Sequence, residues 1–218
     1  NILEKGNGFA KEVYAIKSNL FKNCFYVTSF KSAFDKCSLL TGNINENMFE
    51  NCKNVITFER TFAECSGLTG NISEKLFVNC FKVESFYAVF YKCKVLTGKI
   101  PENLFVNCSN AISFGSIFEE CSGLTGNIPD QLFNNCPNAE SFSRTFSYCK
   151  GLTGSIPDEL FVKCTNAKYF SLTFNHCEGL TGSIPENLFV NCSKAISFAQ
   201  TFYYCNNLTG EIPDNLFI

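Results

Sequence analysis

Apolar residues recur along this chain at a constant spacing of 28 residues. The pattern is clearest for phenylalanine, because three series that start at Phe21, Phe30 and Phe34 continue at this step and hold 22 of the 25 Phe. Self-similarity with a period of about 20 to 50 residues is typical of repeat proteins whose units stack. We therefore predict a solenoid of about seven coils in which equivalent Phe side chains lie over one another. The middle members of the first series are Phe105, Phe133, Phe161 and Phe189.

Within one unit, the order of apolar and polar residues predicts a strand and a return segment. Leu208, Gly210 and Ile212 alternate with polar residues, which is typical of a short strand with one buried face. Pro213 follows at the point where strand pairing should stop. Apolar residues between positions 195 and 205 are spaced by three, four and three residues, as on one face of a helix. The predicted fold class is an α/β repeat solenoid, each coil having a short parallel strand and a short helical or irregular return.

Cysteine follows the same period, since two series account for all 14 Cys. They can be buried thiols that act as small hydrophobes, or they can form disulfides. We favour free thiols, because a disulfide framework usually rescues a chain too small for a core. Zinc is a weaker alternative, because the Cys recur singly and the chain has one His. Four of the predicted core cysteines are Cys108, Cys121, Cys136 and Cys149.

Composition limits the class of protein further. Hydrophobic residues make up 45% and charged residues 17%, which predicts a folded chain. The net charge of −2 has no basic block, so we expect no nucleic-acid partner. No apolar run is long enough to span a membrane. Residues 1–19 keep the period only faintly and are expected to form an N-terminal cap coil, whereas residues 20–218 form the solenoid and stop within a repeat.

The recurring string Phe-x-x-Cys-x-x-Leu-Thr-Gly-x-Ile-Pro resembles the signature of BspA-like leucine-rich repeat proteins and related bacterial surface repeats. The resemblance covers residues 20–218. It implies a leucine-rich-repeat-like solenoid, an extracellular or cell-surface location and an adhesion role in which a protein or glycan is bound. The sequence departs from the usual leucine-rich pattern in using Phe for Leu and in carrying two Cys per coil.

Residues that could carry catalysis do not recur in any pattern. His176 occupies a variable position before Cys177 and is expected to be exposed to solvent. Glu119 and Glu120 are adjacent carboxylates without repeated partners. No nucleophilic triad or Gly-rich phosphate loop can be assembled. We expect no enzyme activity, no cofactor and no bound metal.

Asparagine precedes the first Cys of the unit in six of seven copies, as at Asn107 and Asn191. We expect these side-chain amides to bond to neighbouring backbone, as in a turn or a stacked ladder. Glycosylation is the alternative, because four Asn begin Asn-x-Ser/Thr triplets at different positions of the unit. They are Asn71, Asn107, Asn191 and Asn207.

Two surfaces are candidates for binding. One is an outward column of Thr on the strand face, which includes Thr97, Thr125, Thr153 and Thr181. The other is the return face, where the copies differ most and where five Tyr collect, namely Tyr87, Tyr91, Tyr148, Tyr203 and Tyr204. Binding of a protein or glycan is the leading hypothesis. A stalk or filament built by end-to-end self-association is the alternative, and ice binding by the Thr column is a weaker one.

Overall fold

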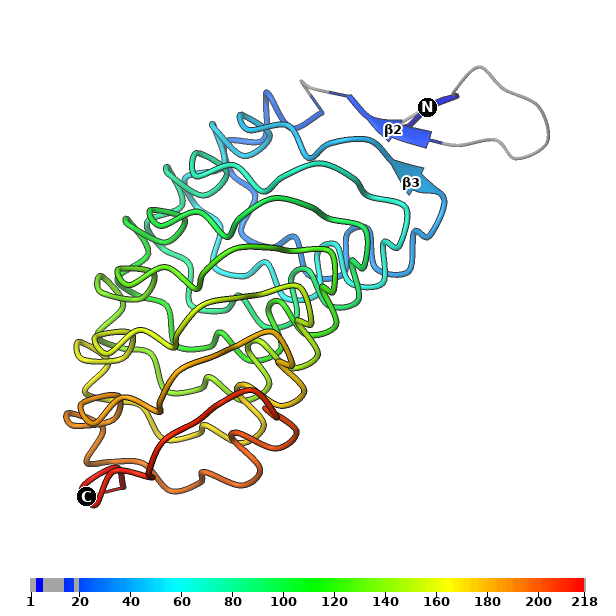
Figure 1. Ribbon diagram of the computed structural model, residues 1–218. Coiled ribbons are helices and arrows are strands. Elements are labelled where there is room, and N and C mark those ends of the chain that lie inside the picture. The colour runs from blue at the N-terminus through cyan, green and yellow to red at the C-terminus, as the bar shows by residue number, and fades with distance from the viewer. Residues whose placement is uncertain (1–2, 6–13, 18–19, 218) are drawn as a thin grey trace.

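The computed structural model describes residues 3–5, 14–17 and 20–217, and in it the chain winds into coils that stack along one axis (Figure 1). At one end, β1 (Leu3–Lys5) pairs antiparallel with β2 (Tyr14–Ile16), and β2 pairs parallel with β3 (Leu40–Thr41). Most of the predicted cap coil, residues 1–19, lies outside the described residues, as does Ile218. The division into a cap and a solenoid therefore stays a prediction.

The predicted strand of each coil is present only as a very short parallel contact. After β3, single bridges join four of the six successive pairs of Leu-Thr-Gly segments, for example Gly126 to Leu152 and Gly154 to Leu180. The Gly of each segment ends the strand, because its φ lies between 77° and 82°. Glycine adopts this left-handed conformation without steric cost, whereas an extended strand cannot pass through it. The alternation of Leu, Gly and Ile is therefore not one strand, although the buried Ile of the middle coils still contributes to the core.

Of the two options predicted for the return, helical or irregular, the described residues show the irregular one, because they contain no helix. From Phe30 to Cys37, alternate amides donate to the next coil: the N–H of Phe30 bonds to Thr57 O at 3.0 Å and that of Phe34 to Thr61 O at 2.9 Å. Between them, the amides of Ala33, Asp35 and Cys37 donate within the coil to the carbonyl three residues earlier, whereas that of Lys31 donates to Ser29 Oγ at 3.1 Å. No membrane-spanning helix exists in the part of the chain that the structure describes.

A left-handed residue at every fourth position explains why this segment is not a helix. Ser32 and Lys36 have φ of 55° and 63°, and their equivalents in every later coil are also positive. Two such residues are separated by four positions, as are Phe30 and Phe34, so both Phe face inward on successive turns. Inward residues four apart also occur on a helix. The spacing of apolar residues alone could not distinguish the two backbones.

The predicted ladder of Phe rings is confirmed. Consecutive rings within the three series lie 5.3 to 6.2 Å apart between centroids, with planes within 17° of parallel. Rings of the first two series also meet at a tilt, with centroids 4.5 to 5.1 Å apart. Offset-stacked and tilted arrangements are the favourable geometries for aromatic pairs. Most of these rings are fully buried, so they form the continuous spine of the solenoid.

The cysteines lie in the core as free thiols. In one of the two series, each Sγ from Cys65 to Cys205 donates to a Phe carbonyl of the preceding coil, as from Cys65 to Phe34 O at 2.9 Å and from Cys121 to Phe90 O at 2.9 Å. Burial raises the pKa of the Cys65 thiol to about 12. These side chains therefore pack as protonated thiols that also satisfy a buried carbonyl.

The asparagines bond between coils, as the structural interpretation predicts. The Nδ2 of Asn107 donates to Val78 O at 2.8 Å, and that of Asn191 to Val162 O at 2.9 Å. A second Asn position, which the sequence analysis missed, makes equivalent bonds, for example from Asn110 to Phe81 O at 3.0 Å. Asn107, Asn191 and also Asn207, which are three of the four triplet Asn, use their amide nitrogen in this way.

Candidate binding surface

The five predicted Tyr lie on one surface, which we call the variable face. It consists of the residues at positions 31, 32, 35, 36 and 38 of the first complete coil and their equivalents at steps of 28. These positions flank the inward Phe, and in each coil two of them are the left-handed residues. The backbone frame is thus the same in every coil, whereas the outward side chains change. Such a frame presents different chemistry along its length without changing shape.

The structure divides the five tyrosines into two groups. Tyr87, which is 41% exposed, lies with Tyr91 in the first half of the solenoid. Tyr148, Tyr203 and Tyr204 lie in the second half, and their exposed fractions are 37%, 48% and 49%. The two groups have different partners: Tyr91 lies beside Arg60 and Lys92, whereas Tyr148 and Tyr204 stack on His176.

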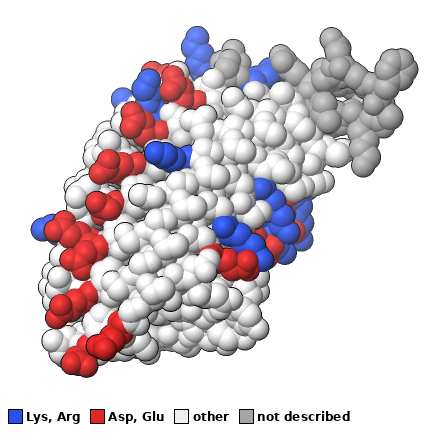
Figure 2. Space-filling view, in the orientation of Figure 1, with Lys and Arg blue, Asp and Glu red and all other residues white. Residues whose placement is uncertain are grey.

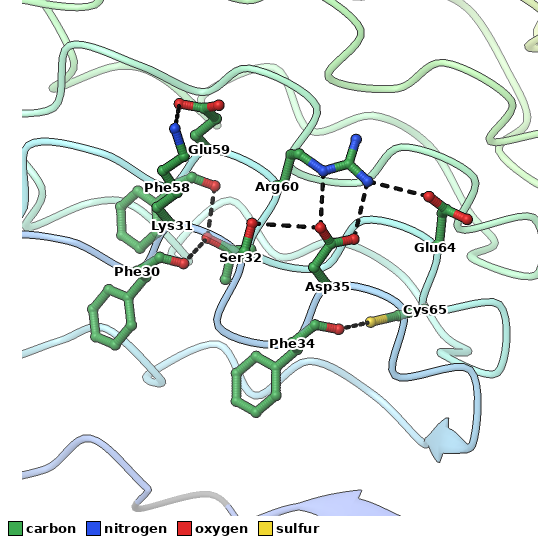
Figure 3. Close-up of polar contacts among 11 residues, drawn as sticks. Phe30, Lys31, Ser32, Phe34, Asp35, Phe58, Glu59, Arg60, Glu64 and Cys65 are labelled. Atoms are coloured by element: carbon green, nitrogen blue, oxygen red, sulfur yellow. Dashed lines mark hydrogen bonds and ion pairs between the residues drawn. The ribbon is translucent and has the colours of Figure 1, made fainter.

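The first group borders a network of charges through Arg60, which lies over the Tyr91 ring and whose contacts with Asp35 and Glu64 are drawn in Figure 3. The Arg60 guanidinium donates through Nε and Nη2 to the two oxygens of Asp35, at 2.9 and 3.0 Å, and Nη2 also contacts Glu64 at 3.1 Å. These hydrogen bonds hold the pKa of Asp35 below its usual value, and they raise that of Arg60. Arg60 also lies over the Tyr91 ring, 5.6 Å from its centroid, as Lys92 does at 4.9 Å. Both cations are placed for cation–π contact.

A hollow of about 270 Å³ lies beside this network. It forms because the repeat position of Ser32 is occupied by Arg60, Ala88, Ser116 and Arg144 in four successive coils, so that two small residues lie between two arginines. Gly115 contributes as well, since a Cβ at this residue would lie 3.2 Å from Cδ2 of Tyr87. The lining residues are Arg60, Tyr87, Ala88, Tyr91, Ser116, Glu119 and Arg144. Five of them were not predicted as binding residues, although the series Arg, Ala, Ser, Arg is visible at the 28-residue step.

The two adjacent glutamates are both held in ion pairs. The carboxylate of Glu119, which is 10% exposed, lies 3.4 Å from Nη1 of Arg144. Glu120 lies 3.1 Å from the Lys94 ammonium and 3.7 Å from that of Lys92. Glu119 thus faces the hollow, whereas Glu120 belongs to the neighbouring column of charged residues.

The second group of tyrosines surrounds His176. The imidazole is stacked between Tyr148 and Tyr204, with centroids 4.3 and 4.4 Å away and planes within 13° of parallel. Tyr203 meets it edge-on at 5.9 Å. The His176 side chain is 18% exposed, so the expectation of a solvent-exposed histidine is wrong. His176 is covered because Tyr148, His176 and Tyr204 occupy one repeat position, and the 28-residue register stacks their rings as it stacks the Phe.

The Thr column is also present on the surface. Thr97, Thr125, Thr153 and Thr181 are exposed, and the N–H of each donates to a Gly carbonyl of the preceding coil at 2.8 to 2.9 Å. Its outward neighbours differ between coils, for example Lys99, Asn127 and Ser155. The Thr hydroxyl therefore recurs in every coil, whereas the side chain beside it differs from coil to coil.

Carboxylates form a further column that was not predicted from the sequence. The residue five positions after Thr is acidic in all seven copies, and Figure 2 shows acidic residues gathered in a line along one edge of the solenoid. No group of three His, Cys, Asp or Glu among the described residues is placed to hold a metal ion. The seven acidic residues are Glu46, Glu74, Glu102, Asp130, Asp158, Glu186 and Asp214.

Comparison with known proteins places residues 10–131 in a family model described as a Mycoplasma protein of unknown function, DUF285. No curated protein matches the chain. Similar solved structures include the BIR3–SERK2 complex from Arabidopsis thaliana, with 22% identity over 68% of each chain and a TM-score of 0.39. The leucine-rich repeat ectodomain of the receptor kinase SOBIR1, also from Arabidopsis thaliana, has 15% identity, covers 93% of this chain and 68% of its own, and has a TM-score of 0.36. A leucine-rich cell surface protein from Faecalibacterium prausnitzii has 16% identity, 96% and 85% coverage and a TM-score of 0.25. These TM-scores are too low to bear on function.

Proposed function

We propose that this chain, which belongs to the DUF285 family, is a non-enzymatic repeat module that binds a partner through its variable face. The observation that carries the proposal is the contrast between a constant frame and changing outward residues. The Phe and Cys of the core repeat in every coil, whereas the repeat position of Tyr148 is Lys, Glu, Lys, Glu, Tyr, His and Tyr along the solenoid. A surface that only had to be soluble would not need aromatic side chains there.

The frame supports binding because it is already ordered. Each coil donates backbone hydrogen bonds to the next at four positions, as from Ser116 to Ser143 O at 2.8 Å, next to fully buried rings. Side chains on such a frame lose little conformational freedom when a partner binds, and less of the interaction energy is spent on ordering. Tyr adds contact area with a polar end and has few rotatable bonds.

The chemistry of the variable face fits recognition better than catalysis. His176 lies between two Tyr rings, and the carboxylates of Glu119 and Glu120 are engaged by Arg144, Lys92 and Lys94. A general base must reach the proton that it removes, and a nucleophile needs an adjacent base. Paired charges and stacked rings instead present a fixed pattern of donors, acceptors and apolar area.

A cell-surface or extracellular location and an adhesion role are part of the same proposal. Their support is the resemblance of the repeat to BspA-like surface repeats. The partner is a protein or a glycan. The free thiols agree with either an oxidising or a reducing compartment, since they are buried and have carbonyl partners.

An array experiment tests the proposed function. The purified chain is applied to protein and glycan arrays beside a variant in which the five variable-face tyrosines are replaced by Ser. We expect at least one ligand that the wild type binds and the variant does not. A matched control replaces Thr97, Thr125, Thr153 and Thr181 by Ser and should bind as the wild type does.

Two results would contradict the proposal. Binding that survives the Tyr replacements but is lost with the Thr replacements would move the site to the Thr column. A wild-type chain that binds nothing, but shows thermal hysteresis in freezing solutions, would favour ice binding by that column.

A further inference from the structure

We infer that the hollow between Arg60 and Arg144 is a subsite for one ring of a neutral saccharide. This inference rests on the proposed function and names the class of ligand. It starts from the shape of the hollow, which has two arginines at its ends, Ala88 and Ser116 between them, and tyrosines beside them.

The size of the hollow limits what can enter. Its volume of about 270 Å³ is slightly below the 300 to 1,000 Å³ typical of pockets for drug-sized ligands. A single sugar ring with its hydroxyl groups suits this volume.

Hydrogen-bonding groups in the hollow remain available after its internal ion pairs are formed. Arg60 uses Nε and Nη2 for Asp35 and Glu64, and Arg144 uses Nη1 for Glu119. Among the described residues, this leaves Nη1 of Arg60, Nε and Nη2 of Arg144 and Oε2 of Glu119 without a partner. Vicinal hydroxyls can accept from a guanidinium and donate to a carboxylate at the same time. Sugars carry such hydroxyl pairs around the ring.

The charges favour a neutral ligand. Asp35 and Glu64 compensate Arg60, and Glu119 compensates Arg144, with N···O distances of 2.9 to 3.4 Å. A phosphate or sulfate would have to compete with these carboxylates for the guanidinium groups. A cation would meet two arginines and Lys92 beside Tyr91. A neutral hydroxyl can bond to a charged side chain even where the charges of the site compensate one another. Such charge-assisted hydrogen bonds are stronger than bonds between neutral groups.

Tyr87 provides the apolar wall. Its ring borders Gly115, where no side chain intervenes, and 41% of the residue is exposed. Tyr91 already has two cations over its ring, so Tyr87 is the tyrosine left to pack against a ligand. The C–H groups on one face of a sugar ring give the apolar area that an aromatic face packs against.

The test fills the hollow with a residue that the same repeat position already carries. Ser116→Arg puts a third arginine between Arg60 and Arg144, at a left-handed position with φ of 54°. The matched control is Leu172→Arg, which lies at the equivalent position two coils further on, with φ of 61°. Both variants gain the same side chain, and unfolding curves check that both fold.

The measurement is saturation-transfer NMR with the methyl glycosides of glucose, galactose, mannose and N-acetylglucosamine. N-acetylneuraminic acid and a Gly-Tyr-Gly peptide are the charged and the peptide probes. We expect at least one neutral glycoside to receive saturation on its ring protons. Its Kd should rise about tenfold or more in Ser116→Arg and by less than about twofold in Leu172→Arg.

Other outcomes would overturn the inference. Equal binding to Ser116→Arg and the wild type would mean that sugars bind elsewhere. Preference for N-acetylneuraminic acid or the peptide would replace a neutral saccharide by another class of ligand. If no probe binds while an array partner still depends on the five tyrosines, the saccharide subsite is wrong and the proposed function stands.

Discussion

The guanidinium of Arg60 holds the carboxylate of Asp35 through two hydrogen bonds, of 2.9 and 3.0 Å, across the boundary between two coils. This bidentate pair ties the outward face of one coil to the next, as the Phe rings do in the core. Arg60 also fixes one end of the hollow. Arg60 therefore contributes both to stability and to the proposed site. The contribution of the Asp35–Arg60 pair to the free energy of unfolding can be measured through the titration of Asp35.

Asp35→Asn should lower the free energy of unfolding by up to about 1 kcal/mol at pH 7, because the pair is partly exposed. The folded-state pKa of Asp35 is depressed, chiefly by the hydrogen bonds from Arg60. Its stabilisation is therefore fully present above the unfolded pKa of about 3.9 and is lost as the pH falls through the folded value. Urea unfolding at a series of pH values should show the difference between the two proteins narrowing below about pH 4. A constant difference would show that the substitution acts through packing.

Phe146→Ala should cost about 3 to 5 kcal/mol, since the removed ring is fully buried and leaves a cavity. Phe146 stacks on Phe118 at 6.0 Å and on Phe174 at 5.7 Å. Phe25→Ala is the control, because Phe25 is 50% exposed and lies outside the three series. Thermal unfolding followed by circular dichroism compares the two variants. Similar losses would mean that the rings do not form the stabilising spine.

Gln200 tests the left-handed backbone positions. Its φ is 56°, so Gln200→Val should destabilise the chain by about 1 to 2 kcal/mol, because a β-branched residue is strained there. Gln200→Gly should be neutral or stabilising by up to about 1 kcal/mol. Ala199→Val, at the exposed neighbouring residue, should change stability by less than about 0.5 kcal/mol. Denaturant unfolding ranks the three variants by their free energy of unfolding. If Gln200→Gly is destabilised, the left-handed backbone at this residue is wrong.

Thiol labelling tests the burial of the cysteines. Cys24 and Cys37 are partly exposed, and the other 12 are buried. Burial raises the pKa of Cys121 well above its usual value, so little thiolate is available to react. With a thiol reagent at pH 8, mass spectrometry should find modification of Cys24 first and of Cys37 more slowly, because burial also raises the pKa of Cys37, and protection of the others until the chain unfolds. A total of fewer than 14 reactive thiols after unfolding without reductant would reveal disulfides.

The core could be predicted from the sequence because every coil repeats it. Phe34, Cys65 and Asn107 each have their contacts fixed by the 28-residue register, and the period alone identifies them. The backbone of the return could be predicted only as helical or irregular, because inward residues four apart, such as Phe30 and Phe34, suit both a helix and the observed series of turns. The left-handed conformation of Ser32 and Lys36 leaves no signature, since neither is Gly or Asn.

The hollow was missed for the opposite reason. It depends on Ala88 and Ser116 lying between Arg60 and Arg144, and a consensus of the repeat removes the differences between copies. The stack around His176 was missed in the same way, because its three rings appear at a position where other coils have Lys or Glu. Comparing one repeat position down successive coils, rather than averaging over them, finds both.

The hydrogen bonds that join each coil to the next have a consequence for how such chains diversify. Because every coil offers its neighbour the same backbone donors and acceptors, a block of 28 residues could be duplicated, lost or exchanged by recombination while each remaining side chain keeps its role in the spine. Only the order of the outward side chains along the solenoid would change. Removing residues 88–115, for example, would bring Arg60 next to Ser116 and shorten the gap between Arg60 and Arg144. Recombination of whole units could thus rewrite the recognition surface in one genetic event and leave the scaffold intact.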